Sequence, residues 1–174
     1  MKLSTLPLAL GAAALAMACT DPGLAPADDS AAPAQEFLIG SSPLIIFLVP
    51  PTQTLNVGVE VTKGIVQAAD NDKFFLRATT TFTSPNGLIA DIGACIEKPT
   101  ATKQDQIRGG GTVSIIMDIN IPDDPWNKLV NAANQGVTIT AHVTVELIMI
   151  DGSGGEHVLD RAEAANAVDP QDGG

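Results

Sequence analysis

Apolar and polar residues alternate along two long stretches of the chain, which is the pattern of β-strands with one buried face. The stretches are GTVSIIMDINI (111–121) and VTITAHVTVELIMI (137–150). In the first, Val113, Ile115, Met117, Ile119 and Ile121 are predicted to point inward, and Thr112, Ser114, Asp118 and Asn120 to face water. Each stretch therefore predicts one strand of a sandwich.

Shorter runs of the same kind predict further strands. They are KFFLRATTTFTS (73–84), LNVGVEVTKGIVQAA (55–69), LIADIGACIEK (88–98) and PLIIFLV (43–49). The apolar phase changes near Gly64, which indicates a bulge. PLIIFLV could also be read as a membrane-dipping segment, but its seven residues and Pro43 suit an edge strand. With a short last strand after the DGSGG turn, the sequence predicts an all-β, antiparallel, Ig-like sandwich of six or seven strands.

Residues 123–136, DDPWNKLVNAANQG, are predicted to form one short helix between the last long strands. Asp124 is expected to be the N-cap, Pro125 the first helical residue and Gly136 the stop. The apolar stripe is expected to cover the open end of the sandwich. It also provides a candidate surface for a ligand or partner, formed by Trp126, Leu129 and Val130.

The N-terminus has the features of an export signal. Lys2 precedes the apolar run LPLALGAAALAMA, which is shorter than the roughly 20 residues that span a bilayer. The run therefore predicts a cleaved signal peptide over residues 1–18. Ala16-Met17-Ala18 suits an ordinary signal peptidase, whereas Ala18-Cys19 resembles the lipobox of bacterial lipoproteins. That resemblance implies that Cys19 becomes the lipid-modified first residue, with plain secretion as the alternative.

Two segments lack the regular spacing of apolar residues that is typical of strands and helices. Residues 20–36, rich in Pro, Ala and acids, are predicted to form a disordered linker after the lipidated Cys19. Residues 162–174 are expected to be a disordered tail. The sandwich domain is then assigned to residues 37–161.

Composition and charge limit the fold class and the kinds of partner that the chain can have. Hydrophobic residues make up 45% of the 174 residues, but aromatic residues only 3%, so the core must consist of aliphatic side chains, which favours strands. The net charge of −11 argues against nucleic acid as a partner.

The order of these elements resembles the type-2 late-embryogenesis-abundant domain, also called the water-stress and hypersensitive-response (WHy) domain, over roughly residues 56–150. The resemblance is carried by VGVEVTKGIV, by FFLRATTTFTSPNGL with its Ser84-Pro85-Asn86 turn, by GGGTVSIIMDINIP and by PWNKLVNAANQGVTITAHVTVEL. It implies a β-sandwich without a catalytic motif, whose relatives are discussed as stress-protective, interaction or lipid-contacting modules.

The chain lacks the short motifs of common hydrolase, zinc and nucleotide sites. His142 and His157 are predicted to be surface residues rather than metal ligands. Four residues could supply oxygen ligands to a calcium ion: Asp118, Asn120, Asp123 and Asp124. Their spacing fits no EF-hand, however, and each suits a strand face or a helix start. We therefore expect no metal, no cofactor and no catalytic residue.

Cys95 has two possible positions. Simple alternation places it on the polar face with Asp91 and Glu97, whereas a bulge at Gly93 would turn it inward. A buried thiol is expected if Cys19 is lipidated, because Cys95 then has no partner within the chain.

Together these features predict a cell-envelope lipoprotein, held on a membrane by its N-terminal lipid. Thr20 after Cys19 favours the outer membrane. The sandwich is expected to be a non-catalytic interaction or stress-protective module. The alternative is a carrier of lipids or other hydrophobic ligands, with a cavity between the sheets and Trp126 near its mouth.

Overall fold

The computed structural model describes residues 37–39, 45–63 and 68–171, which form eight strands and two α-helices. The signal, the linker and the phase change near Gly64 lie outside these residues. In chain order the elements are β1 (Phe37–Ile39), β2 (Ile45–Val49), the 3-10 turn η1 (Pro50–Thr52), β3 (Thr54–Lys63), β4 (Lys73–Ser84), β5 (Gly87–Glu97), α1 (Ala101–Gly109), β6 (Thr112–Asn120), α2 (Asp123–Asn134), β7 (Ile139–Ile150) and β8 (Glu156–Val168).

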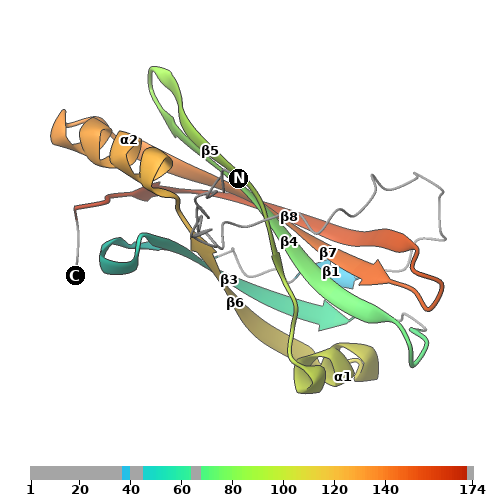
Figure 1. The fold of residues 1–174 in the computed structure, drawn as a ribbon. Helices are drawn as coiled ribbons and strands as arrows, with labels where there is room; N and C mark the ends of the chain where they lie inside the picture. The colour runs from blue at the N-terminus through green and yellow to red at the C-terminus, as the bar shows by residue number, and fades with distance from the viewer. Residues whose placement is uncertain (1–36, 40–44, 64–67, 172–174) are drawn as a thin grey trace, which may run out of the picture.

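The strands form two antiparallel sheets, as Figure 1 shows. In the first sheet, β3 pairs with β1 and β2 along one side and with β6 along the other. The second sheet has the order β5-β4-β7-β8. The predicted all-β sandwich is therefore confirmed.

The core lies between the sheets and consists mainly of aliphatic side chains. The inward positions predicted for β6 are buried, as are those predicted for β7 from Ile139 to Leu147, whereas Met149 is half-buried. Phe74, Leu76 and Phe82 of β4 join them. In the sheet that contains β6, β3 contributes the buried residues Leu55, Val57, Val59 and Val61. Strict alternation predicted these faces because successive side chains of a strand point to opposite sides.

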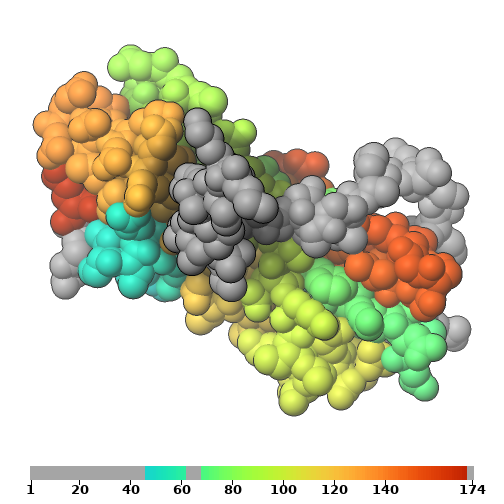
Figure 2. All heavy atoms as spheres, in the orientation of Figure 1, coloured from blue at the N-terminus to red at the C-terminus, as the bar shows by residue number. Residues whose placement is uncertain are grey.

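The two flanks of the sandwich differ. On one flank β8 lies against β1 and β2, and the Asn166 Nδ2 donates a hydrogen bond to the backbone oxygen of Ile46 at 2.9 Å. The other flank carries the outer edges of β5 and β6, which are connected through α1. Figure 2 shows α1 at one end of the molecule, with α2 and the β4–β5 hairpin at the opposite end.

A bulge in β5 settles the position of Cys95. Thr80 pairs with Gly93 and Thr81 with Asp91, so Ile92 is an extra residue, and Gly93 has a φ of 75°. The bulge places Cys95 opposite the buried Ala78, and Cys95 packs against the core. The inward alternative is thus confirmed, but the expected buried thiol is not found, because Cys95 is half-buried and disulfide-bonded.

The predicted disordered tail is wrong for residues 162–168. These residues belong to β8, a strand of 13 residues that pairs with β7 up to Val168. Ala162 and Ala164 pack against the core. Small side chains gave little hydrophobic signal, but the edge of β7 supplies hydrogen-bonding partners for this backbone.

The prediction of a single helix is also wrong, because α1 precedes β6. Thr100 is its N-cap and its side chain accepts a hydrogen bond from the backbone N–H of Lys103 at 3.4 Å. Gly110 ends the helix with a φ of 91°. Such a left-handed residue after the last turn favours glycine, which has no Cβ.

The second helix, α2, is confirmed, but its start differs from the prediction. The N-cap is Pro122, and Asp124 lies in the first turn, where its carboxylate pairs with Lys128 at 2.6 Å. Pro125 consequently comes two residues later in the helix than predicted. Gly136, with a φ of 70°, follows the last turn as expected.

Candidate functional site

The predicted contact surface on α2 is only partly available to a partner. Leu129 is fully buried in the core, so its inclusion in that surface is wrong. Trp126 and Val130 are half-buried, and Trp126 packs against the core. The apolar stripe of α2 therefore serves mainly to attach the helix to the sandwich, where α2 contacts β5 and β7.

A cavity of about 430 Å³ lies where α2 ends and β7 begins. Its walls are mostly small or apolar residues, from the end of α2, the connection to β7 and the end of β8: Ala133, Gly136, Val137, Thr138, Ile139, Ala167, Val168 and Asp169. Beside it, the side chain of Gln171 donates a hydrogen bond to Asn134 of α2. Trp126 is not one of the lining residues, so this cavity differs from the predicted one between the sheets.

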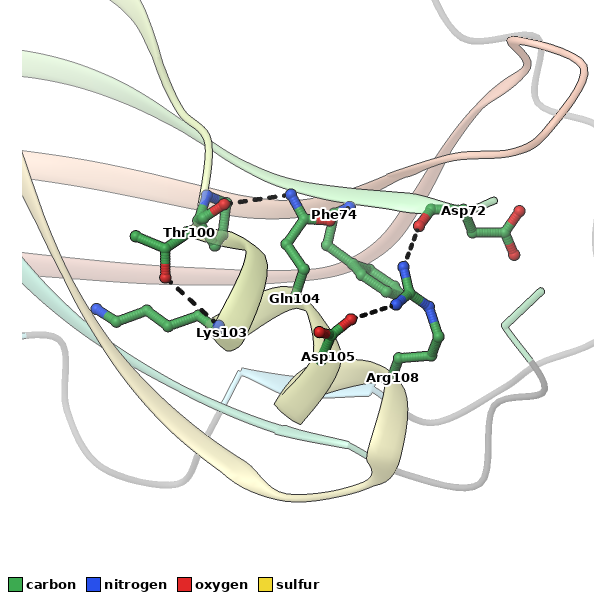
Figure 3. Close-up of polar contacts among 8 residues, drawn as sticks. Asp72, Phe74, Thr100, Lys103, Gln104, Asp105 and Arg108 are labelled. Carbon is green, nitrogen blue, oxygen red and sulfur yellow. Dashed lines mark hydrogen bonds and ion pairs between the residues drawn. The ribbon is translucent and has the colours of Figure 1, made fainter. Parts of the chain in front are cut away.

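A larger and more polar cavity, of about 600 Å³, lies at the opposite end, between the turn before β4 and the β7–β8 turn. Arg108 of α1 lines it and holds the first turn, because its guanidinium donates to the backbone oxygen of Asp72 at 2.8 Å and to the Asp105 carboxylate at 2.7 Å. The carboxylate of Asp72 accepts from the backbone N–H of Ala69 at 2.7 Å. Figure 3 shows how α1 places Arg108 beside this turn.

The other wall of this cavity is the β7–β8 turn, which is organised by Asp151. Its carboxylate accepts hydrogen bonds from the hydroxyl and backbone N–H of Ser153, at 2.6 and 2.8 Å, and from the backbone N–H of Gly155 at 2.9 Å. His157 Nε2 lies 2.8 Å from the same carboxylate. The Ser153 hydroxyl and His157, followed by the backbone N–H groups, lower the pKa of Asp151 well below its ordinary value. Asp151 is thus the first residue of the predicted DGSGG turn, and it holds that turn together.

An ionic cluster covers part of the outer face of the second sheet. Arg77 of β4 pairs with Glu146 of β7 at 2.8 Å and with Glu156 of β8 at 3.0 Å. Burial disfavours the charged form of Arg77 and so lowers its pKa. The carboxylates of Glu146 and Glu156 outweigh this effect, and the pKa of Arg77 is raised. These three side chains are therefore occupied with one another across three strands.

The histidines and acids considered as ligands lie apart. His142 is exposed on β7, as predicted, and its Nε2 lies 2.8 Å from the Thr83 hydroxyl. Asp118 and Asn120 face outward on β6. Within the described residues, no group of three or more His, Cys, Asp or Glu is placed to hold a metal ion. In the same part of the chain, no helix has the length and apolar character needed to cross a membrane.

The outer face of the first sheet carries a patch that the sequence analysis missed. Ile116 of β6 is 62% exposed and Phe47 of β2 is 46% exposed. The strand register places Gly58 of β3 directly beside Ile116, whereas Phe47 on the far side of β3 pairs with Asn56, two residues from Gly58 along the strand. Ile116 could have been found, because it is an apolar residue at an outward position of a strictly alternating strand. We call Phe47, Gly58 and Ile116 the sheet patch.

Comparisons with known proteins leave the family open. No protein-family model matches the chain, and a search of curated proteins finds no match. Among solved structures, the solution structure of the Arabidopsis thaliana protein AT1g01470 is similar, with 14% sequence identity and a TM-score of 0.44. The match covers 87% of this chain and 93% of that chain.

Proposed function

We propose that this chain is a lipid-anchored module of the bacterial cell envelope, whose β-sandwich works through contact with a partner and not through catalysis. The sheet patch is the observation that carries the proposal. Exposed Ile116 and Phe47 lie on the same sheet face, which points away from the core, and apolar side chains gathered on an outer face are a candidate contact surface.

Three polar residues of the larger cavity support contact over catalysis, because each has a structural task. In the cavity of about 600 Å³, Arg108 and the Asp72 carboxylate hold one turn and Asp151 holds the other. A catalytic acid or base must exchange protons with a substrate, whereas these groups donate to or accept from their own backbone. The resemblance to the WHy domain is in line with a stress-protective role for such a module.

The anchor is proposed from the sequence alone, at Cys19, and the outer membrane is its proposed location. Cys95 is disulfide-bonded, and the chain has one other cysteine, Cys19, which lies outside the described residues. A sulfur that carries a lipid cannot also hold a disulfide bond. Lipidation and disulfide formation are therefore alternative states of Cys19, with different masses.

The first experiment is intact mass and peptide analysis of the mature protein from its native host, combined with membrane fractionation. We expect an acylated Cys19 and a membrane-bound protein, with Cys19→Ala releasing the protein and Cys95→Ala leaving it membrane-bound. An unmodified Cys19 linked to Cys95, in a protein that is soluble in all three forms, would overturn the anchor and leave a secreted contact module.

The carrier alternative draws support from the cavity of about 430 Å³ beside α2, whose volume is within the usual range for small ligands. A carrier of the kind the sequence predicts, with its ligand between the sheets and Trp126 near the mouth, would change the fluorescence of Trp126, the single tryptophan of the chain, when vesicles or fatty acids are added. A ligand in the cavity beside α2 would instead protect the backbone amides of Val137 and Thr138, which line it, from hydrogen exchange. We expect no change across such a panel, because Trp126 packs against the core and does not line that cavity.

A further inference from the structure

The edge of β6 is the most regular strand edge in the described part of the chain. Its nine residues pair with β3 without a register shift, and no described strand pairs with its other side. The opposite sheet is different, because β5 and β8 each contain a register shift. In the first sheet, the edge opposite β6 is divided between the short strands β1 and β2.

Proteins usually protect such an edge with lysine, proline, a bulge or a covering element. The sequence of β6, TVSIIMDIN, contains no proline and no basic residue, and Asp118 is its one charge. Over residues 114–118 the strand carries none of these sequence features, and such an edge is suited to pairing with another strand.

The hydrogen-bond pattern between β6 and β3 shows which backbone groups of β6 are available to a further strand. Ile121 donates its backbone N–H to Gln53 at 2.8 Å, and opposite residues of an antiparallel pair alternate between bonded and non-bonded positions. The backbone groups of Ile115, Met117 and Ile119 therefore point to β3. Those of Ser114, Ile116 and Asp118 point away from it, toward the free edge.

We propose that β6 pairs antiparallel with β6 of a second copy of this chain, around a two-fold axis at Ile116. This inference rests on the proposed contact function and names a partner for the part of the sheet patch formed by Ile116. Ile116 is the midpoint of β6. An axis there places Ser114 opposite Asp118 of the other copy and Ile116 opposite Ile116, with two backbone hydrogen bonds for each such pair.

The side chains fit this register. The hydroxyl of Ser114 lies opposite a carboxylate, which can accept its hydrogen bond, and the two Asp118 residues are about 14 Å apart, four residue steps along the strand. The two exposed isoleucines meet at the axis and cover each other's apolar surface. An isologous contact of this kind closes at two copies.

The test measures association and backbone pairing together. It uses the full chain with Cys19→Ala under reducing conditions, so that neither acyl chains nor disulfides contribute to association. The result therefore does not depend on whether Cys19 carries a lipid in the cell. Sedimentation should show a monomer–dimer equilibrium, favoured by added salt because the charge of −11 repels a second copy. Amide hydrogen exchange at Ser114, Ile116 and Asp118 should slow as the protein concentration rises, whereas exchange at Ile115 and Met117 should not change.

Ile116→Lys places two like charges at the axis and should raise the dimer dissociation constant about tenfold or more. Leu88→Lys is the matched control, because it adds the same charge at a site 66% exposed in the β4–β5 hairpin and should leave dimerisation unchanged. Ser114→Lys, which creates an opposite-charge pair with Asp118, should tighten the dimer about threefold or more.

Three outcomes would overturn the pairing. One is a monomer at every concentration with fast exchange at Ser114 and Ile116. Another is a monomer in which these amides are protected at every dilution, which would assign the edge to a segment of the same chain. The third is a dimer that Ile116→Lys and Leu88→Lys weaken equally.

Discussion

At the residue scale, Thr80 is the clearest local defect of the core. It is fully buried on the inward face of β4, and its hydroxyl has no hydrogen-bond partner among the described residues. A buried hydroxyl without a partner carries an uncompensated desolvation cost. We predict that Thr80→Val raises the free energy of unfolding by about 1 kcal/mol.

Chemical denaturation of the two proteins checks this value. Thr79→Val is the control, because Thr79 is the exposed neighbour on the same strand, and its change should stay within about 0.5 kcal/mol. A loss of stability in Thr80→Val would mean that the hydroxyl makes a hydrogen bond in solution.

Asp151 predicts a dependence of stability on pH. Its pKa is lower in the folded chain than in the unfolded chain, so folding favours the charged carboxylate. The stabilising contribution is therefore complete above the ordinary aspartate pKa of about 3.9 and is lost as the pH falls below it. The loss comes from protonation of an oxygen that accepts from Ser153, Gly155 and His157.

Thermal unfolding between pH 7 and pH 2 measures this contribution. We expect Asp151→Asn to melt below the parent protein at pH 7, with the difference shrinking below about pH 4. Asp70→Asn, in the exposed turn at the same end of the molecule, controls for the loss of one negative charge. A pH-independent difference between parent and Asp151→Asn would contradict the assignment.

At the element scale, α1 completes the edge of β4. β5 pairs with β4 only as far as the Leu76–Glu97 pair, so the first residues of β4 have no partner from β5. There, the side-chain oxygen of Gln104 accepts from the backbone N–H of Phe74 at 3.1 Å, and its nitrogen donates to the backbone oxygen of Pro99 at 3.3 Å. Figure 3 shows this link between helix and strand.

We predict that Gln104→Ala lowers the free energy of unfolding by about 1–3 kcal/mol, because it removes a buried acceptor from a backbone N–H. Gln106→Ala is the matched control, since Gln106 is exposed on the same helix, and it should change stability by less than about 0.5 kcal/mol. Urea unfolding followed by circular dichroism distinguishes the two. Equal effects would indicate that helix propensity, and not the link to Phe74, governs α1.

The same helix shows why sequence patterns predicted strands better than helices here. The strand β4 has the predicted bounds, 73–84, because its apolar residues recur at every second position. In α1, Gln104 and Ile107 are the buried residues, so the helix has almost no apolar stripe. The signals that remained were Thr100 as a cap and Gly110 as a stop, with Arg108 in the last turn, and these mark a helix only weakly without the stripe.

At the scale of the whole molecule, the candidate surface could be predicted less well than the fold. The spacing of Trp126, Leu129 and Val130 indicated a helix, but the residues that attach a helix to a core are buried by that packing, as Leu129 is. The sheet patch depends on the register of three strands. Periodicity along one strand cannot predict that Ile116 pairs with Gly58, because these two residues are far apart in the sequence.

The short strand β1 also has a mechanical consequence. It is the first described element, and only three residues, Phe37–Ile39, pair with the end of β3. A pull transmitted from the preceding residues would load the Phe37–Lys63 pair first, so the three pairs of β1 and its contacts with β8 would bear the load before the five pairs of β2. In a tethered chain, β1 would therefore detach from β3 before the longer pairing of β2 with β3 is loaded.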